Sequence, residues 1–258
     1  RPYRVELWAD GVLCDEEWPV GDFGIADAVW NAPVEVKPYT ENLTPLPSVL
    51  GTFRNAEGWR PEENVFVGDC MPYADDKRFH VIYLKDRHHH HSKYGSGAHQ
   101  WSHISTTDFD TWQIHPDVVE IDEQWEGSIC TGSHIEYKGK HYLYYTIRAC
   151  DGSPAPICRS VSEDGSHYEK DRAFRMVLSD AYCKVSARDP KVVLAEDGIL
   201  HMFVTTTLLS EKKGCLAHLT SSDGDTWHED PTPIYIAPDV DQPECPDYFK
   251  YHDTFYLV

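Results

Sequence analysis

A motif that returns about every sixty residues constrains this chain more than any other feature of its sequence. The motif places a Ser or Thr, an Asp and an aromatic residue at fixed spacing between alternating aromatic and β-branched stretches. Its aspartates step by 56 and then 59 residues, and its aromatic residues take the same steps. The residues are Asp108, Asp164 and Asp223, with Trp112, Tyr168 and Trp227. Such a period in a strand-rich sequence is typical of the blades of a β-propeller.

Each repeat also contains an apolar stretch with a lone polar residue beside Gly or Pro, then a few turn residues and an alternating strand. The four copies are 65–72 before 79–84, 129–133 before 142–145, 187–191 before 201–204, and 243–247 before 255–258. The sequence therefore predicts an all-β propeller with four units of this kind.

Lone acids occupy matching places in three of these units. They are Asp69, Asp189 and Glu244, and the second unit offers Ser133 instead. Because the innermost strand of every propeller blade runs along the central channel, residues at matching places on different blades converge at the axis. We therefore expect three carboxylates from three blades to meet in one pocket.

Four stretches, in this order along the chain, resemble the motifs of one enzyme family. They are Gln100-Trp101-Ser102-His103 followed by Ser105 and Trp112, then Cys130-Thr131-Gly132-Ser133, Arg188-Asp189-Pro190 and Glu244-Cys245-Pro246-Asp247. The last two resemble the RDP and ECPD signatures of glycoside hydrolase family 32, the five-bladed-propeller β-fructosidases that include invertases, inulinases and levanases. The first acid departs from the family pattern, because Gly68-Asp69-Cys70-Met71-Pro72 stands where the family has W-M-N-D-P-N-G.

The resemblance implies a fold and a set of roles. The fold class is then all-β, a five-bladed β-propeller with about four blades in this chain. Asp69 would be the nucleophile of a retaining β-fructosidase, Glu244 its general acid/base and Asp189 the stabiliser of the transition state. Arg188 would neutralise part of the acid cluster and grip sugar hydroxyls. The other expected substrate contacts are Gln100, Trp101, Thr131 and Ser133, and no cofactor or metal is expected.

Two other functions stay open at this point. Retaining glycosidases hold their two carboxyl groups about 5–5.5 Å apart and inverting ones about 6.5–9.5 Å apart, and a sequence does not give that separation. One alternative is an inverting hydrolase of arabinose- or xylose-containing glycans from a related five-bladed family. The other is a carbohydrate-binding propeller without catalysis.

Charge and cysteine content bear on partners and location. The formal net charge of −20 argues against nucleic acid as a partner, because binding to phosphate backbones needs basic patches. A carbohydrate is the expected partner, and no membrane-spanning segment is visible. The eight cysteines contain no C-x-x-C pair, and reduced thiols would favour the cytoplasm over secretion. The sequence leaves the oligomeric state open.

The first sixty residues differ from the rest. Asp10-Gly11 between two apolar stretches indicates a β-hairpin, and the sequence around it resembles the edge of a β-sandwich. Prolines between Asn31 and Pro47 indicate an extended linker. We therefore expect a sandwich-like fragment with its linker over 1–60, a boundary near Trp59-Arg60-Pro61, and a propeller over 61–258 that is incomplete at its C-terminal end.

Overall fold

The structure is a computed structural model that describes residues 5–9, 12–17, 51–54, 59, 61, 66–86, 99–123 and 125–258. The chain divides into two compact units, Arg1–Pro47 and Ser48–Val258. In the first unit, β1 (Val5–Ala9) pairs antiparallel with β2 (Val12–Glu17), which confirms the hairpin predicted from Asp10-Gly11. The predicted proline-rich linker lies outside the described residues.

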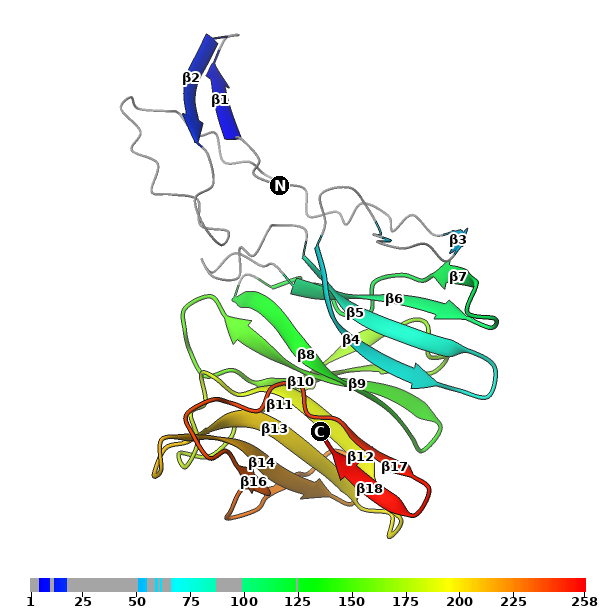
Figure 1. The fold of residues 1–258 in the computed structure, drawn as a ribbon, viewed down its shortest axis with the longest axis vertical. Helices are drawn as coiled ribbons and strands as arrows, with labels where there is room; N and C mark the ends of the chain where they lie inside the picture. The colour runs from blue at the N-terminus through cyan, green and yellow to red at the C-terminus, as the bar shows by residue number, and fades with distance from the viewer. Residues whose placement is uncertain are drawn as a thin grey trace. The chain divides into compact units, whose positions relative to one another are not determined.

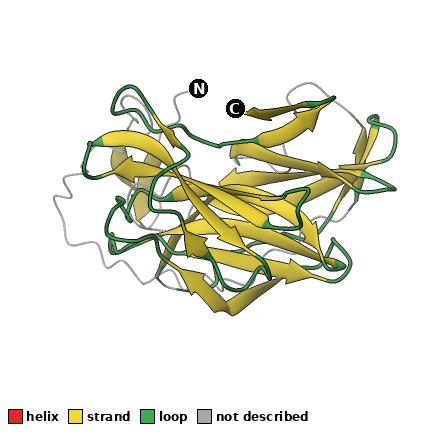
Figure 2. Cartoon of the chain, turned by 90° about the horizontal axis from the view of Figure 1, so that it is seen from below, coloured by secondary structure: helices red, strands yellow, loops and turns green. Residues whose placement is uncertain are grey.

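The second unit is built from antiparallel sheets, and its described residues contain strands and loops but no helix (Figures 1 and 2). The first sheet has the order β3-β7-β6-β5-β4, from β3 (Thr52–Arg54), β4 (Phe66–Ala74), β5 (Phe79–Asp86), β6 (His99–Thr106) and β7 (Thr111–Ile114). The second has the order β11-β10-β9-β8, from β8 (Glu126–Tyr137), β9 (Lys140–Ala149), β10 (Ile157–Ser162) and β11 (Glu169–Met176).

The third sheet runs β12-β13-β14-β15, from β12 (Arg188–Leu194), β13 (Leu200–Leu208), β14 (Lys213–Ser221) and β15 (His228–Glu229), and β16 (Tyr235–Ile236) also pairs with β14. The fourth is the hairpin of β17 (Tyr248–Tyr251) and β18 (Thr254–Leu257). These sheets are the blades of a propeller, and the predicted all-β fold is confirmed. No described helix is long and apolar enough to cross a membrane.

The strand β3 lies before the boundary predicted from the sequence. It pairs with β7 over Thr52–Arg54, so these residues belong to the sheet of the first blade. The predicted boundary at Trp59-Arg60-Pro61 therefore falls after the outermost strand of that blade.

The repeated Asp motif forms the corner between the third and fourth strands of three blades. In the third blade, one oxygen of Asp223 accepts hydrogen bonds from the amides of Asp225 and Thr226, both at 2.8 Å, and Ser221 Oγ accepts one from Gly224 N at 2.9 Å. Asp108 and Asp164 hold their corners in the same way. The sixty-residue period therefore marks a turn that its own Asp side chain stabilises.

Tyrosines tie the corners of the second and third blades to the blade before each of them. Tyr73 of β4 donates its hydroxyl to the carbonyl of Gly165 at 3.3 Å, and Tyr144 of β9 donates to the carbonyl of Gly224 at 3.2 Å. Apolar clusters fill the same two interfaces, with Ile82 and Ile129 in one and Tyr144 and Met202 in the other. Successive blades are thus joined at the core and at the periphery.

The innermost strands β4, β8 and β12 lie next to one another, with β8 contacting both others, and each contains a bulge. In each bulge two residues face a single residue of the second strand. The pairs are Gly68 and Asp69, Cys130 and Thr131, and Asp189 and Pro190. Bulges redirect side chains locally and interrupt the ladder, so the strands present side chains out of register at these three places, and β8 has a further bulge at Gly127.

The bulges correct one part of the repeat alignment. Thr131, and not Ser133, stands at the position in β8 that corresponds to Asp69 in β4. The sequence comparison placed Ser133 there, which lies two residues further along β8, after the bulge.

Candidate active site

The three acids line one pocket of about 210 Å³ at the ends of the innermost strands. Asp69 comes from β4, Asp189 from β12, and Glu244 from the segment before β17. The remaining lining residues are Leu84, His99, Ser128, Cys130, Thr131, Arg148, Arg188 and Cys245. The structure therefore brings together the carboxylates that the repeat predicted to converge.

Asp69 is held from the neighbouring blade. Thr131 Oγ1 donates a hydrogen bond to Asp69 Oδ2 at 2.6 Å. The same carboxylate oxygen lies 3.6 Å from Cys245 Sγ, and that sulfur lies 3.9 Å from Asp189 Oδ2. Both contacts to Asp69 use one oxygen, so its other carboxylate oxygen is the one available for reaction.

Arg188 holds Glu244. Arg188 Nη2 donates to Glu244 Oε1 at 2.5 Å, and its Nη1 donates to Gln242 Oε1. Gln242 is fixed in turn by its amide, which donates to Ser186 Oγ at 2.9 Å and to Thr207 Oγ1. The side chain of Glu244 is exposed, with 66% of its surface accessible. Because packing holds it little, the Arg188 guanidinium is the group that orients this acid.

Asp189 is the buried member of the three acids, at 5% exposure. Burial raises its pKa to about 6, and the nearby charges of Glu244 and Asp69 add to that rise. The amide of Cys245, which donates to Asp189 Oδ2 at 3.1 Å, and the guanidinium of Arg188 act in the opposite direction. Asp189 and Cys245 both have left-handed backbones, with φ of 55° and 51°, so this contact rests on two unusual backbone conformations.

Three cysteines adjoin the acids, and none is suited to act as a nucleophile. Burial raises the pKa of Cys70 and Cys130, and burial together with the charges of Asp189 and Asp69 raises that of Cys245 to about 12. Only a thiolate is a good nucleophile. The thiol of Cys245 acts instead as a weak donor between two carboxylates.

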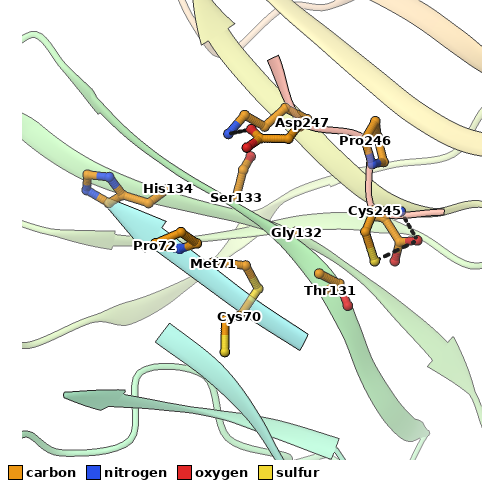
Figure 3. Close-up of a pocket in the computed structure, with 12 residues that line it drawn as sticks. Cys70, Met71, Pro72, Thr131, Gly132, Ser133, His134, Cys245, Pro246 and Asp247 are labelled. Atoms are coloured by element: carbon orange, nitrogen blue, oxygen red, sulfur yellow. Dashed lines mark hydrogen bonds and ion pairs between the residues drawn. The ribbon is translucent and has the colours of Figure 1, made fainter. Parts of the chain in front are cut away.

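A second, smaller pocket of about 90 Å³ shares Thr131, Asp189 and Cys245 with the first (Figure 3). Its other lining residues are Cys70, Met71, Pro72, Gly132, Ser133, His134, Lys191, Pro246 and Asp247. Figure 3 shows the labelled residues on β4, on β8 and on the segment after Glu244, and Lys191 belongs to β12. The shared residues form the wall between the two pockets.

Comparison with known proteins decides the family. The model of the glycosyl hydrolases family 32 N-terminal domain matches residues 69–256. The chain belongs to glycoside hydrolase family 32. Among its relatives in this family, the raffinose invertase of Escherichia coli is 28% identical over 190 residues, which are 70% of this chain and 38% of that protein. The sucrose-6-phosphate hydrolase of Escherichia coli is 27% identical over 215 residues, 78% of this chain and 41% of that protein.

Solved structures of family 32 proteins share the fold. Fructan 1-exohydrolase IIa from Cichorium intybus superposes with a TM-score of 0.62 at 16% identity, over 78% of this chain and 37% of that one. Sucrose-6-phosphate hydrolase from Lactobacillus gasseri superposes with a TM-score of 0.59 at 18% identity, over 74% and 39%. The chain thus spans about two fifths of the length of the family 32 relatives it matches.

The residues expected to bind substrate are divided between the pocket and the core. Thr131 and Arg188 line the pocket. Ser133 is buried, and its hydroxyl donates to Pro190 O and accepts from Val192 N, both at 2.8 Å, so it joins β8 to β12 beside the Asp189 bulge.

Two other expected contacts have partners inside the protein. Trp101 is fully buried, and its indole donates to Cys130 O at 3.0 Å. Gln100 donates its amide to Asp117 at 3.1 Å, and Asp117 also pairs with the buried Lys85 at 2.7 Å. Neither Gln100 nor Trp101 lines the pocket of the acids, so in this structure both support the first blade.

Sequence reasoning missed a group on the wall of the pocket: His99, Ser128 and Arg148. Arg148 and His99 lie outside the innermost strands, near the end of β9 and at the start of β6. The repeat alignment followed only the innermost strands, whereas the adjoining strands also end at the rim of the pocket. Arg148 in β9 pairs with Ser128 in β8. An alignment of the repeats that included the second strand of each blade would therefore have placed Arg148 beside the pocket.

Carboxylates spaced closely enough for a cation occur once among the described residues, at Asp122, Glu123 and Glu126. Lys170 and Arg172 already form ion pairs with these acids. The group therefore has its counter-charges within the protein. The adjacent histidines at 88–91 lie outside the described residues.

Proposed function

We propose that this protein is a retaining β-fructosidase that hydrolyses fructose-containing oligo- or polysaccharides. The observation that carries the proposal is the single pocket in which Asp69, Asp189 and Glu244 meet from three blades. Membership of glycoside hydrolase family 32 supports the choice of fructosides over arabinose- or xylose-containing glycans. The names of the relatives, an invertase of raffinose and a hydrolase of sucrose 6-phosphate, point to the same class of substrate.

In the proposed first step, Asp69 attacks the anomeric carbon while Glu244 protonates the departing glycosidic oxygen. Thr131 holds one oxygen of Asp69, which leaves the other to form the bond to the sugar. The leaving alcohol departs with the proton of Glu244. The result is a fructosyl ester on Asp69 and an ionised Glu244 beside Arg188.

In the second step, Glu244 takes a proton from water, whose oxygen attacks the anomeric carbon and releases Asp69. Arg188 keeps Glu244 in place through both steps. Asp189 in its ionised form accepts hydrogen bonds from sugar hydroxyls and favours the positive charge that develops on the ring. Because its pKa is about 6, this role requires a pH above that value.

The test is a screen on sucrose, raffinose, inulin and levan, with the anomer of released fructose identified by NMR before it equilibrates. We expect turnover with retention, lost in Asp69→Ala and preserved in Asp76→Ala, which removes an exposed acid of the turn after β4. Inversion, or turnover only on arabinosides and xylosides, would refute the fructosidase proposal. Sugar binding without any turnover would indicate a carbohydrate-binding propeller.

A further inference from the structure

Arg148 is a cation on the wall of the acid pocket, and its side chain has no partner among the residues that the structure describes. The acids already have their partners: Thr131 for Asp69, the amide of Cys245 for Asp189, and Arg188 for Glu244. Among the residues that the structure describes, the side chain of Arg148 has neither an ion pair nor a hydrogen bond. Its guanidinium is therefore available to a ligand in the pocket.

The backbone that carries Arg148 is tightly placed. Arg148 pairs with Ser128 across β8 and β9, between the buried residues Ile147 and Ala149. A Cβ on Gly127 would stand 2.6 Å from the carbonyl oxygen of Arg148, so only glycine fits against this strand. The base of the side chain is thus fixed by close packing while the residue itself is exposed.

Two neighbours extend the polar wall around Arg148. Ser128 contributes a hydroxyl that accepts from the amide of His99 at 3.4 Å, and the His99 imidazole lies 3.6 Å from the buried carboxylate of Asp86. The wall therefore combines a free guanidinium, a hydroxyl and an imidazole in one pocket.

We propose that Arg148 recognises an anionic group on the sugar, a phosphate or a carboxylate, and so selects charged glycosides. A guanidinium fork matches the two oxygens of such a group and holds them more strongly than neutral hydroxyls. The chain carries a formal net charge of −20, so an anionic sugar needs a local cation of this kind to enter. The inference rests on the proposed glycosidase function, whose substrate class it narrows.

The test compares kcat/KM for three substrates: sucrose, sucrose 6-phosphate, and the sucrose analogue with a uronate in place of glucose. Each is measured with the wild type, Arg148→Met, Arg148→Lys and Arg172→Met. Arg172 provides the matched control, because it is a partly exposed arginine that pairs with Asp122 away from the pocket.

We expect the wild type to prefer one anionic substrate over sucrose by about tenfold or more, the scale of hydrogen bonds to a charged group. Arg148→Met should remove the preference, Arg148→Lys should keep part of it, and Arg172→Met should keep all of it. The favoured substrate tells phosphate from carboxylate. A wild type without preference, or an Arg148→Met variant that loses activity equally on all three, would overturn the inference.

Binding separates this inference from the proposed function. Calorimetry of glucose and glucose 6-phosphate with the wild type and Arg148→Met needs no turnover, and glucose 6-phosphate carries its phosphate on the same sugar as sucrose 6-phosphate. If no substrate is hydrolysed but glucose 6-phosphate binds more tightly than glucose through Arg148, the proposed function fails and the anion site stands. If sucrose is hydrolysed and neither assay shows a preference for anions that depends on Arg148, the proposed function stands and the anion site fails.

Discussion

Acid should destabilise this protein through histidines buried where the first blade meets the second. His103 of β6 has no exposed surface, and its ring stacks on His115 with centroids 4.2 Å apart. Tyr73 stacks on His80 at 4.5 Å and on His134 of the next blade at 3.5 Å. The rings form a continuous stack across the interface.

The hydrogen bonds of the stack require neutral rings. His80 Nε2 lies 3.3 Å from Asp75 Oδ2, and because an ionised carboxylate only accepts, this nitrogen carries the proton. His80 Nδ1 then accepts from His103 Nε2 at 2.8 Å. This leaves His103 Nδ1 unprotonated, and no described residue offers it a hydrogen bond. A second proton on His103 would place a charged N–H in the core without an acceptor.

The size of the effect can be worked out for His103 and His115, and His134, whose pKa burial lowers to about 3, adds to it in the same direction. Burial lowers the pKa of His103 to about 2 and that of His115 to about 4, against about 6.5 in the unfolded chain. As the pH falls below 6.5, these histidines bind protons in the unfolded state but stay neutral in the folded state. Their contribution to the free energy of unfolding is therefore fully present above pH 6.5 and declines below it. At pH 5 each histidine costs about 2 kcal/mol, and the pair about 4 kcal/mol.

Urea unfolding at pH 7 and at pH 5 measures this loss. His103→Phe keeps a stacked ring and removes one titrating group, so it should reduce the loss between the two pH values by about 2 kcal/mol. His228→Gln, which changes an exposed histidine of β15, should leave the loss unchanged. If His103→Phe loses as much stability on acidification as the wild type, the histidine stack is not the cause.

Three further predictions concern the acids and the strand that supports them. Asp69→Ala should lower kcat by several orders of magnitude while KM changes less, because it removes the covalent route; near wild-type turnover on a confirmed substrate would exclude Asp69 as nucleophile. Asp189→Asn should abolish turnover yet raise the free energy of unfolding at pH 7 by up to about 3 kcal/mol, because the Asp189 pKa of about 6 means that the folded state disfavours its charge. A urea unfolding experiment in which Asp189→Asn is less stable than the wild type would contradict this prediction. Ser133→Ala should cost about 2–5 kcal/mol, because it leaves a buried carbonyl and a buried amide of β12 without partners, whereas the exposed Ser222→Ala should cost little in the same denaturation assay.

The convergence of the acids was predictable because it depends only on periodicity. Repeats of equal length place equivalent residues at equivalent points of successive blades, and Asp69, Asp189 and Glu244 stand near the same point of their repeats. The Asp corners, whose turn chemistry is local, are equally visible in the sequence. The convergence of the acids and the Asp corners can therefore both be predicted without any knowledge of packing.

The assignment of side chains around the acids depends on features that a single sequence does not display. The bulge in β8 directs the side chain of Thr131 toward Asp69, whereas Ser133 lies between β8 and β12. No residue type in the sequence indicates a bulge at this place. Trp101 lies on a strand whose two faces are both covered, so alternation did not tell its core face from a sugar-binding face. Arg148 belongs to the second strand of its blade, and its lack of a side-chain partner in the described part of the chain depends on three-dimensional packing alone.

The tyrosine contacts between blades have a consequence for how the protein opens. The corner turn of the second blade receives the hydroxyl of Tyr73 from the first, and that of the third receives Tyr144 from the second. A blade that loosens therefore withdraws a donor from the turn of the blade that follows it. Amide hydrogen exchange in these turns should follow the opening of the preceding blade, so that loss of protection spreads along the propeller in the direction of the chain.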